Sequence, residues 1–93
     1  MSVTVRVPTI LRTYTGGEAE VAVEPAEPTL SGVIAALDAL APGIGGRILD
    51  DEGRLRRFVN VYVGDDDVRF LDGLDTPTPA GSSISVIPAV AGG

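Results

Sequence analysis

The chain has 93 residues, 44% of them hydrophobic, and a formal net charge of −6 that comes from thirteen Asp and Glu against seven Arg. This length suits one domain with one modest core, and the negative charge argues against nucleic acid or an anionic membrane as a partner. Cys, His, Trp and Lys are all absent, which excludes disulfides, thiolate and imidazole chemistry, Schiff bases and most transition-metal sites.

The N-terminal part of the chain predicts a β-hairpin. In the range 3–7 every second residue is Val, which is typical of a half-buried strand, and Pro8 closes it. The Gly16-Gly17 pair signals a turn. Residues 18–24 then alternate again, with Ala or Val on one face and Glu on the other. We therefore expect two strands joined by a glycine turn.

A single main helix is predicted for residues 30–40, where the spacing of the apolar residues changes. Thr29 is the expected N-cap, and Pro42 and Gly43 supply a stop. Gly32 costs about 1 kcal/mol relative to Ala inside a helix, so its presence suggests close packing on a sheet. The apolar residues recur at helical spacing and form one stripe: Leu30, Val33, Ile34, Leu37 and Leu40.

The second half of the chain predicts three more strands after an irregular stretch at 43–56 that contains one short helical turn. Residues 59–63 place three Val on one face of a strand. Residues 64–67, GDDD, form a tight turn into a further strand at 68–71. After a loop rich in Pro and Gly, residues 83–88 form the last strand, in which Ile and Val alternate with Ser.

The order of elements, ββ-α-ββ-β, predicts an α+β fold of the β-grasp type. In this arrangement a mixed sheet packs on one main helix, and the first and last strands run parallel at its centre. We expect a β-grasp domain at 1–88 and a flexible C-terminal tail at 89–93. No signal peptide and no membrane-spanning run is visible, so the cytoplasm is the expected location.

No internal group of residues predicts a catalytic or metal site. The adjacent carboxylates of GDDD at 64–67 lack the spacing of a calcium loop, so a solvated turn is favoured over a cation site. Residues 50–52, DDE, are interpreted as a solvated loop or part of an acidic face that would dock a basic partner. Tyr14 and Tyr62 have no recognisable basic partner, and packing or a surface role is favoured for both.

The C-terminal sequence SVIPAVAGG, residues 85–93, is the remaining candidate. A carboxylate at the tip of a tail without side chains can enter a narrow channel of another enzyme, where a β-carbon would collide with the walls. Glycine also leaves the carbonyl carbon open to attack. Gly93 is therefore the predicted site of chemistry, and contacts from Val90 and Ile87 would offset the entropy lost on docking.

Three segments carry a resemblance to a known family: VPTILRTYTGG, RFVNVYVGDDDVRF and DGLDTPTPAGSSISVIPAVAGG. Together they resemble the ubiquitin-like sulfur carriers of the MoaD/ThiS type over nearly the whole chain, most closely the branch that serves cysteine biosynthesis. The chain departs from the family pattern at two points. It has Gly81-Ser82 where members often have Gly-Asp, and Ala89 where many have a second Pro.

The resemblance implies a sulfur carrier, which is a protein substrate and not an enzyme. An E1-like adenylating enzyme of the MoeB/ThiF/MoeZ type would activate the Gly93 carboxylate with ATP, and sulfur from a persulfide would convert it to a thiocarboxylate. A sulfur-accepting synthase would use it, such as a PLP-dependent cysteine synthase acting on O-phosphoserine, and a JAMM-type zinc metalloprotease would release cysteine. ATP, PLP and zinc would belong to these partners, with no cofactor bound by the chain itself.

The resemblance also implies roles for the residues that precede Gly93. Ile87 and Pro88 match positions that dock the activating enzyme. Two alternatives use the same terminus: a small subunit of molybdopterin synthase, and a ubiquitin-like modifier that is joined to target lysines. The residues that would pass through a partner's channel are Ala89, Val90, Ala91 and Gly92.

Overall fold

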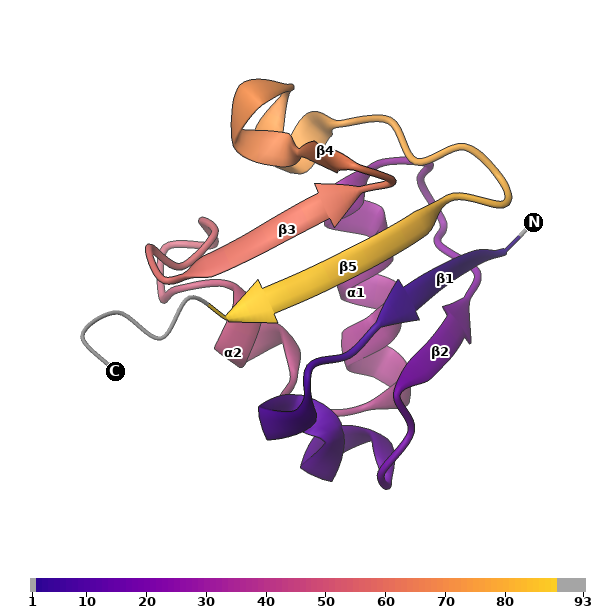
Figure 1. Cartoon of the computed structure of the whole chain (residues 1–93), viewed down its shortest axis with the longest axis vertical. Helices are drawn as coiled ribbons and strands as arrows, with labels where there is room; N and C mark the ends of the chain where they lie inside the picture. The colour runs from indigo at the N-terminus through magenta and orange to yellow at the C-terminus, as the bar shows by residue number, and fades with distance from the viewer. Residues whose placement is uncertain (1, 89–93) are drawn as a thin grey trace.

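A mixed five-stranded sheet forms one layer of the fold, and helix α1 crosses behind it as the other (Figure 1). The computed structural model describes residues 2–88. The strands are β1 (Val3–Arg6), β2 (Glu20–Val23), β3 (Val59–Val63), β4 (Asp66–Asp67) and β5 (Ser83–Pro88). The helices are α1 (Leu30–Leu40), α2 (Gly45–Ile48) and the 3-10 segments η1 (Thr9–Thr15), η2 (Val68–Phe70) and η3 (Gly73–Asp75).

The strand order β2-β1-β5-β3-β4 places the first and last strands side by side at the centre of the sheet. β1 and β5 are parallel, with Val5 opposite Ile84, whereas the β2–β1, β5–β3 and β3–β4 pairs are antiparallel. This is the β-grasp arrangement, so the predicted fold class is confirmed. The predicted tail, residues 89–93, lies outside the residues that the structure describes.

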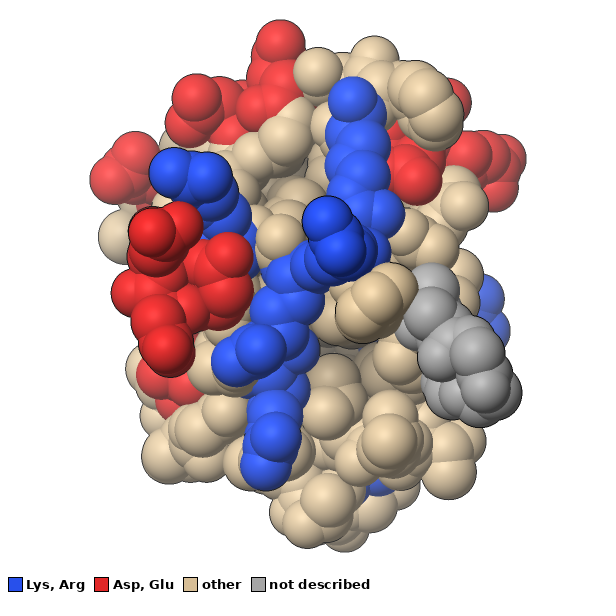
Figure 2. All heavy atoms as spheres, turned by 90° about the vertical axis from the view of Figure 1, so that its left-hand side faces the viewer, with Lys and Arg blue, Asp and Glu red and all other residues tan. Residues whose placement is uncertain are grey.

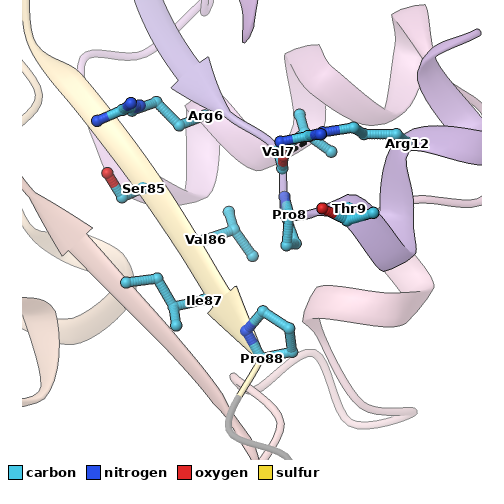
Figure 3. Close-up of a pocket in the computed structure, with 9 residues that line it drawn as sticks. All are labelled: Arg6, Val7, Pro8, Thr9, Arg12, Ser85, Val86, Ile87 and Pro88. Carbon is cyan, nitrogen blue, oxygen red and sulfur yellow. Dashed lines mark hydrogen bonds between the residues drawn. The ribbon is translucent and has the colours of Figure 1, made fainter. Parts of the chain in front are cut away.

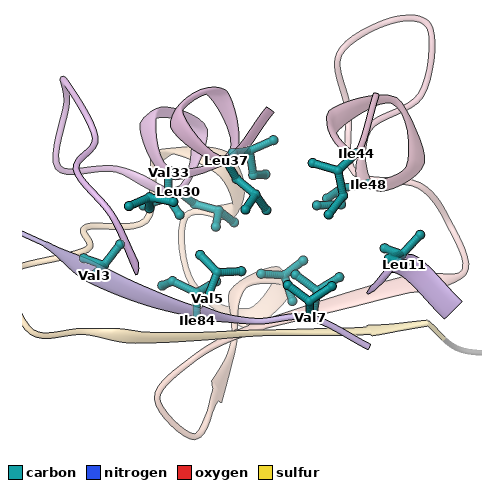
Figure 4. Packing of buried hydrophobic residues seen from close by; sticks show 14 of the residues in the cluster. Val3, Val5, Val7, Leu11, Leu30, Val33, Leu37, Ile44, Ile48 and Ile84 are labelled. Atoms are coloured by element: carbon teal, nitrogen blue, oxygen red, sulfur yellow. The ribbon is translucent and has the colours of Figure 1, made fainter. Parts of the chain in front are cut away.

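The core lies between α1 and the inner face of the sheet (Figure 4). Four of the five predicted stripe residues of α1 are buried: Leu30, Val33, Ile34 and Leu37. They pack with alternating residues of the central strands, among them Val3, Val5, Val61, Ile84 and Val86. Burying a Val, Leu or Ile side chain contributes about 1.5–3 kcal/mol, so this interface is the main source of stability.

The fifth predicted stripe residue, Leu40, is 63% exposed, and its placement in the core was wrong. It is the last residue of α1 and lies at the margin of the apolar stripe. There it borders a surface hollow together with Ala22 of β2. β2 has only four residues and does not cover it. Ala41, the next residue, is buried in its place.

The N-terminus of α1 is built as predicted, with one difference at Gly32. The Thr29 side chain accepts a hydrogen bond from the Gly32 N–H (3.2 Å), which confirms the N-cap. Gly32 does pack closely, but against the loop before the helix and not against the sheet. A Cβ at this position would fall far inside van der Waals contact with the Glu27 carbonyl oxygen.

Residues 68–70 form a 3-10 turn, so the strand predicted at 68–71 was wrong. β4 has two residues, and the Asp67 carboxylate then accepts a hydrogen bond from the Arg69 N–H (2.8 Å), which caps η2. Val68 is fully buried. The chain turns out of the sheet at this point because η2 places Val68 in the core.

A second helical segment, η1, was not predicted between β1 and β2. The glycine turn is present at its end, where Gly16 has a φ of 67°, in the left-handed region that favours glycine. Before it, residues 9–15 form a 3-10 helix whose Leu11 is buried. The short helical turn predicted at 43–56 is confirmed as α2.

Replacing Gly32 by Ala is expected to destabilise the fold, although Ala favours helix. The new Cβ must displace the Glu27 backbone, and we expect a loss of about 1–3 kcal/mol in the free energy of unfolding. Gly46→Ala in α2 is the matched control, because its Cβ would meet nothing within 4 Å. Urea unfolding measures both variants. A Gly32→Ala protein as stable as the Gly46→Ala protein would contradict the close approach.

Candidate functional site

The candidate site is a hollow at the edge of the sheet where β1 and β5 end (Figure 3). Parallel strands end at the same edge, but β5 continues further than β1. Pairing on the β1 side stops at Arg6 opposite Ser85, whereas on the β3 side it continues to Val59 opposite Pro88. The resulting hollow has a volume of about 380 Å³ and is lined by Arg6, Val7, Pro8, Thr9, Arg12, Ser85, Val86, Ile87 and Pro88.

Local sequence explains why β1 stops and the hollow forms. Pro8 lacks an N–H and cannot continue a ladder, so the chain leaves the sheet and enters η1. Arg12 of η1 folds back, and its Nε donates to the Val7 carbonyl oxygen (3.1 Å). Arg6 lies on the outer face of the sheet, with its Nε 3.6 Å from the Glu20 Oε2. Two guanidinium groups therefore stand beside an apolar strand end.

The hollow is equipped for contact and not for acid–base chemistry. None of the described residues that line it is a carboxylate, and its two charged groups are guanidiniums, which donate hydrogen bonds but accept none. Val86 is buried, whereas Ile87 is 47% exposed. An exposed Ile beside Pro88 offers apolar surface to a partner protein. Both predicted docking residues lie here, at the end of β5.

The predicted tail residues cannot be placed in this site. Ala89, Val90, Ala91, Gly92 and Gly93 all lie outside the described residues. The chain reaches Pro88 at the rim of the hollow, so any segment that follows starts from there. The roles assigned to these five residues stay predictions.

Arg69 holds the start of β3, against which the end of β5 pairs. Its Nη1 donates to the Asn60 Oδ1 (2.5 Å), and Asn60 is in register with Ile87 on β5. Its Nη2 donates to three main-chain carbonyl oxygens, those of Arg56 (2.8 Å), Arg57 (3.1 Å) and Val59 (2.8 Å). This side chain was missed in the sequence, because nothing in the pattern around position 69 marks partners that lie nine or more residues away.

Tyr14 has both roles that its sequence left open, packing and a surface contact, and it has a basic partner that the sequence did not reveal. Its hydroxyl accepts a hydrogen bond from the Arg47 Nε (2.7 Å), which joins η1 to α2. That hydrogen bond raises the pKa of Arg47 above its usual value. Tyr14 is half-buried and packs against the core at the same time.

The acidic stretches build turns. The Asp50 Oδ1 accepts hydrogen bonds from the N–H groups of Arg54 (3.0 Å) and Glu52 (2.8 Å), and these bonds lower the pKa of the Asp50 carboxyl. In the segment 64–67 the residues make the β3–β4 turn and β4. Within residues 2–88, no group of three or more carboxylates is arranged to hold a metal ion.

None of the helices that the structure describes is both long and apolar enough to cross a bilayer.

Comparisons with known proteins agree with this geometry. The ThiS family model matches residues 5–93. The sulfur carrier protein CysO of Mycobacterium tuberculosis is 50% identical over the full length of both chains. A chain in the crystal structure of the Amycolatopsis orientalis BexX/CysO complex superposes with a TM-score of 0.87 at 46% identity, covering 98% of this chain and 99% of that one. Small archaeal modifier protein 3 of Haloferax volcanii is 37% identical over 72% of each chain.

Arg69→Ala is expected to loosen the start of β3. Four hydrogen bonds are lost together, and we expect the protein to lose about 1–3 kcal/mol of stability and the amides of residues 56–60 to exchange faster. Lys lacks the guanidinium fork, so Arg69→Lys should not restore the wild-type behaviour. Hydrogen exchange and thermal unfolding are the measurements. Arg57→Ala is the control. Equal exchange at 56–60 in the Arg69→Ala and control proteins would refute the role of Arg69.

Proposed function

The chain belongs to the ThiS family, and we propose that it is a sulfur carrier whose Gly93 carboxylate is converted to a thiocarboxylate by partner enzymes. The observation that carries this proposal is the 50% identity to a sulfur carrier protein over the full length of both chains. Among the described residues, those around the end of β5 include no carboxylate, which supports the proposal because a carrier needs a docking surface and a reactive terminus but no catalytic side chains.

The chemistry of the terminus runs in two stages. A carboxylate is a poor electrophile, so an oxygen of the Gly93 carboxylate first attacks the α-phosphorus of ATP. Pyrophosphate leaves, and a mixed anhydride with AMP remains. A persulfide sulfur then attacks the carbonyl carbon and AMP leaves. A thiol of the partner then attacks the partner's own sulfur in the resulting acyl disulfide, a disulfide forms within the partner, and the thiocarboxylate of Gly93 leaves with one sulfur.

The partners supply every cofactor in this cycle. An E1-like enzyme binds ATP and forms the adenylate, and a synthase accepts the sulfur, a PLP-dependent cysteine synthase being the leading candidate. A zinc metalloprotease of the JAMM type would free a product that stays attached to the tail. A related chain is known from a BexX/CysO complex, which supports a cycle that depends on partner proteins.

The hollow at the end of β5 would position the tail for its partner. Ile87 and Pro88 form the last described part of the chain and lie beside Arg6 and Arg12. A partner that covers Ile87 buries apolar surface there, which offsets the entropy lost when residues 89–92 extend into its channel. Gly92 and Gly93 would then occupy the narrowest part, where a side chain cannot fit.

A ubiquitin-like modifier is the second candidate function. The 37% identity to a small archaeal modifier protein favours it. Both functions begin with the same adenylate and differ in what displaces AMP. A sulfur nucleophile gives the carrier, and an amine of a target lysine gives the modifier.

We expect Gly92→Val and deletion of Gly93 to abolish thiocarboxylate formation without loss of stability. The first adds a side chain inside the partner's channel, and the second removes the activated residue. The chain is incubated with Mg-ATP, an E1-like adenylating enzyme and a sulfur source, and intact mass spectrometry detects the exchange of one oxygen for one sulfur. Thiocarboxylate on the truncated chain would refute the mechanism. Conjugates to lysine without sulfur would favour the modifier.

Ile87→Asp should weaken activation through the docking step. Ile87 is 47% exposed, so the fold should tolerate Asp, whereas a charged residue at the apolar contact should raise the KM for the carrier about tenfold. Leu40→Asp is the matched control, since Leu40 is 63% exposed on α1, away from β5. ATP–pyrophosphate exchange measures the KM of the adenylating enzyme for each variant. An equal KM for the two variants would rule out docking through Ile87.

A further inference from the structure

Positive charge is concentrated on one face of this acidic chain. Five of its seven arginines fall between positions 47 and 69. Figure 2 shows the basic side chains as a blue stripe down this face, with red clusters of carboxylates on both sides. Four arginines make up what we call the arginine ridge: Arg47, Arg56, Arg57 and Arg69.

Contacts between neighbours make the ridge continuous. Arg69 donates through Nη2 to the carbonyl oxygens of Arg56 and Arg57. Arg56 donates through Nε (3.0 Å) and Nη2 (2.7 Å) to the carbonyl oxygen of Gly46, the residue before Arg47. The ridge therefore runs from η2 across the loop before β3 to α2.

Three of the four ridge arginines are held in place by hydrogen bonds, and within residues 2–88 none of the four forms an ion pair, although the charge of Arg56 helps to lower the pKa of Asp50. Within residues 2–88, the groups that accept from Arg47, Arg56 and Arg69 are a hydroxyl, an amide oxygen and main-chain carbonyls, all uncharged, and Arg57 has no side-chain partner. By contrast, Arg54 lies 3.7 Å from the Glu52 carboxylate. Guanidiniums that are fixed by uncharged acceptors and stand outside ion pairs are pre-organised to bind anionic groups.

Exposed aromatic rings lie next to the ridge in the sequence. The chain has two Phe residues, and neither is in the core. Phe58 follows Arg57 and is 53% exposed, and Phe70 follows Arg69 and is 87% exposed. Leaving the largest apolar side chains in water is unfavourable, and Arg together with aromatic residues is the composition of protein interfaces.

We propose that the arginine ridge, with Phe58 and Phe70, docks an acidic surface of the E1-like enzyme that adenylates the tail, with carboxylates facing the guanidiniums and apolar pockets receiving the rings. This inference rests on the proposed carrier function. The ridge adjoins the end of β5, because Arg69 bonds Asn60 and Asn60 is in register with Ile87. A partner on the ridge therefore lies close to the end of β5, where the described part of the chain stops.

A protein fits this surface better than a nucleic acid. The chain carries a net charge of −6, and carboxylates flank the ridge on both sides, so a long phosphate backbone would be repelled at the margins. An acidic strip on a protein can match the ridge alone. From the sequence we expected an acidic face that docks a basic partner. On this face the charges are the opposite, and we expect an acidic partner surface.

The first test measures kcat and KM of the E1-like adenylating enzyme for the carrier at low and high salt. Arg57→Glu and Phe70→Ser should each raise the KM about fivefold with kcat unchanged, and Arg57→Glu should flatten the salt dependence. Arg54→Glu makes the same charge change beside the ridge, and Leu40→Ser removes another exposed apolar side chain, outside the ridge; both should match wild type. The proposal fails if ridge and control variants behave alike.

A second measurement separates the ridge from the carrier chemistry. The full ¹⁵N-labelled chain is titrated with a short poly-glutamate peptide and, separately, with a single-stranded oligothymidylate. Peptide-induced amide shifts around the ridge that vanish in Arg57→Glu support the proposal, even if Gly93 is never adenylated. The proposal is overturned if the peptide causes the same amide shifts in Arg57→Glu, or if the oligothymidylate binds more tightly than the peptide. If the chain binds the peptide at the ridge but the E1-like enzyme does not adenylate Gly93, only the carrier function is refuted.

Discussion

The parallel pairing of β1 with β5 is the constraint on which the rest of the structure depends. Parallel neighbours cannot be joined by a tight turn, so the chain between them must cross over the sheet. α1 makes that crossing and covers one face with its apolar stripe, which leaves the other face to solvent. Because β1 stops before Pro8, β5 extends beyond the end of β1, and the hollow beside Ile87 forms there.

Features governed by local patterns could be predicted from the sequence. Alternating Val residues marked β1 and β3, helical spacing marked α1, and Thr29 marked its N-cap, which the Gly32 N–H confirms. The strand order followed from one helix between two β regions. The tail was singled out by residue types alone, and its placement lies outside the described residues.

Features that depend on tertiary contacts could not be predicted. The 3-10 turn at 68–70 forms because Val68 is drawn into the core, and an alternating apolar pattern there is equally compatible with a strand. Leu40 fits the helical period but lies at the end of α1 near a strand too short to cover it. Arg69 has partners nine to thirteen residues earlier, which no local spacing reveals.

The extra length of β5 also has a mechanical consequence. A pulling force on Pro88 acts along the axis of β5, whereas the β3–β5 hydrogen bonds lie across that axis. The five paired positions from Ile84 to Pro88 then share the load in shear, so they must yield together and cannot peel apart one at a time. The domain can thus resist a pulling force at the end of β5 without unfolding.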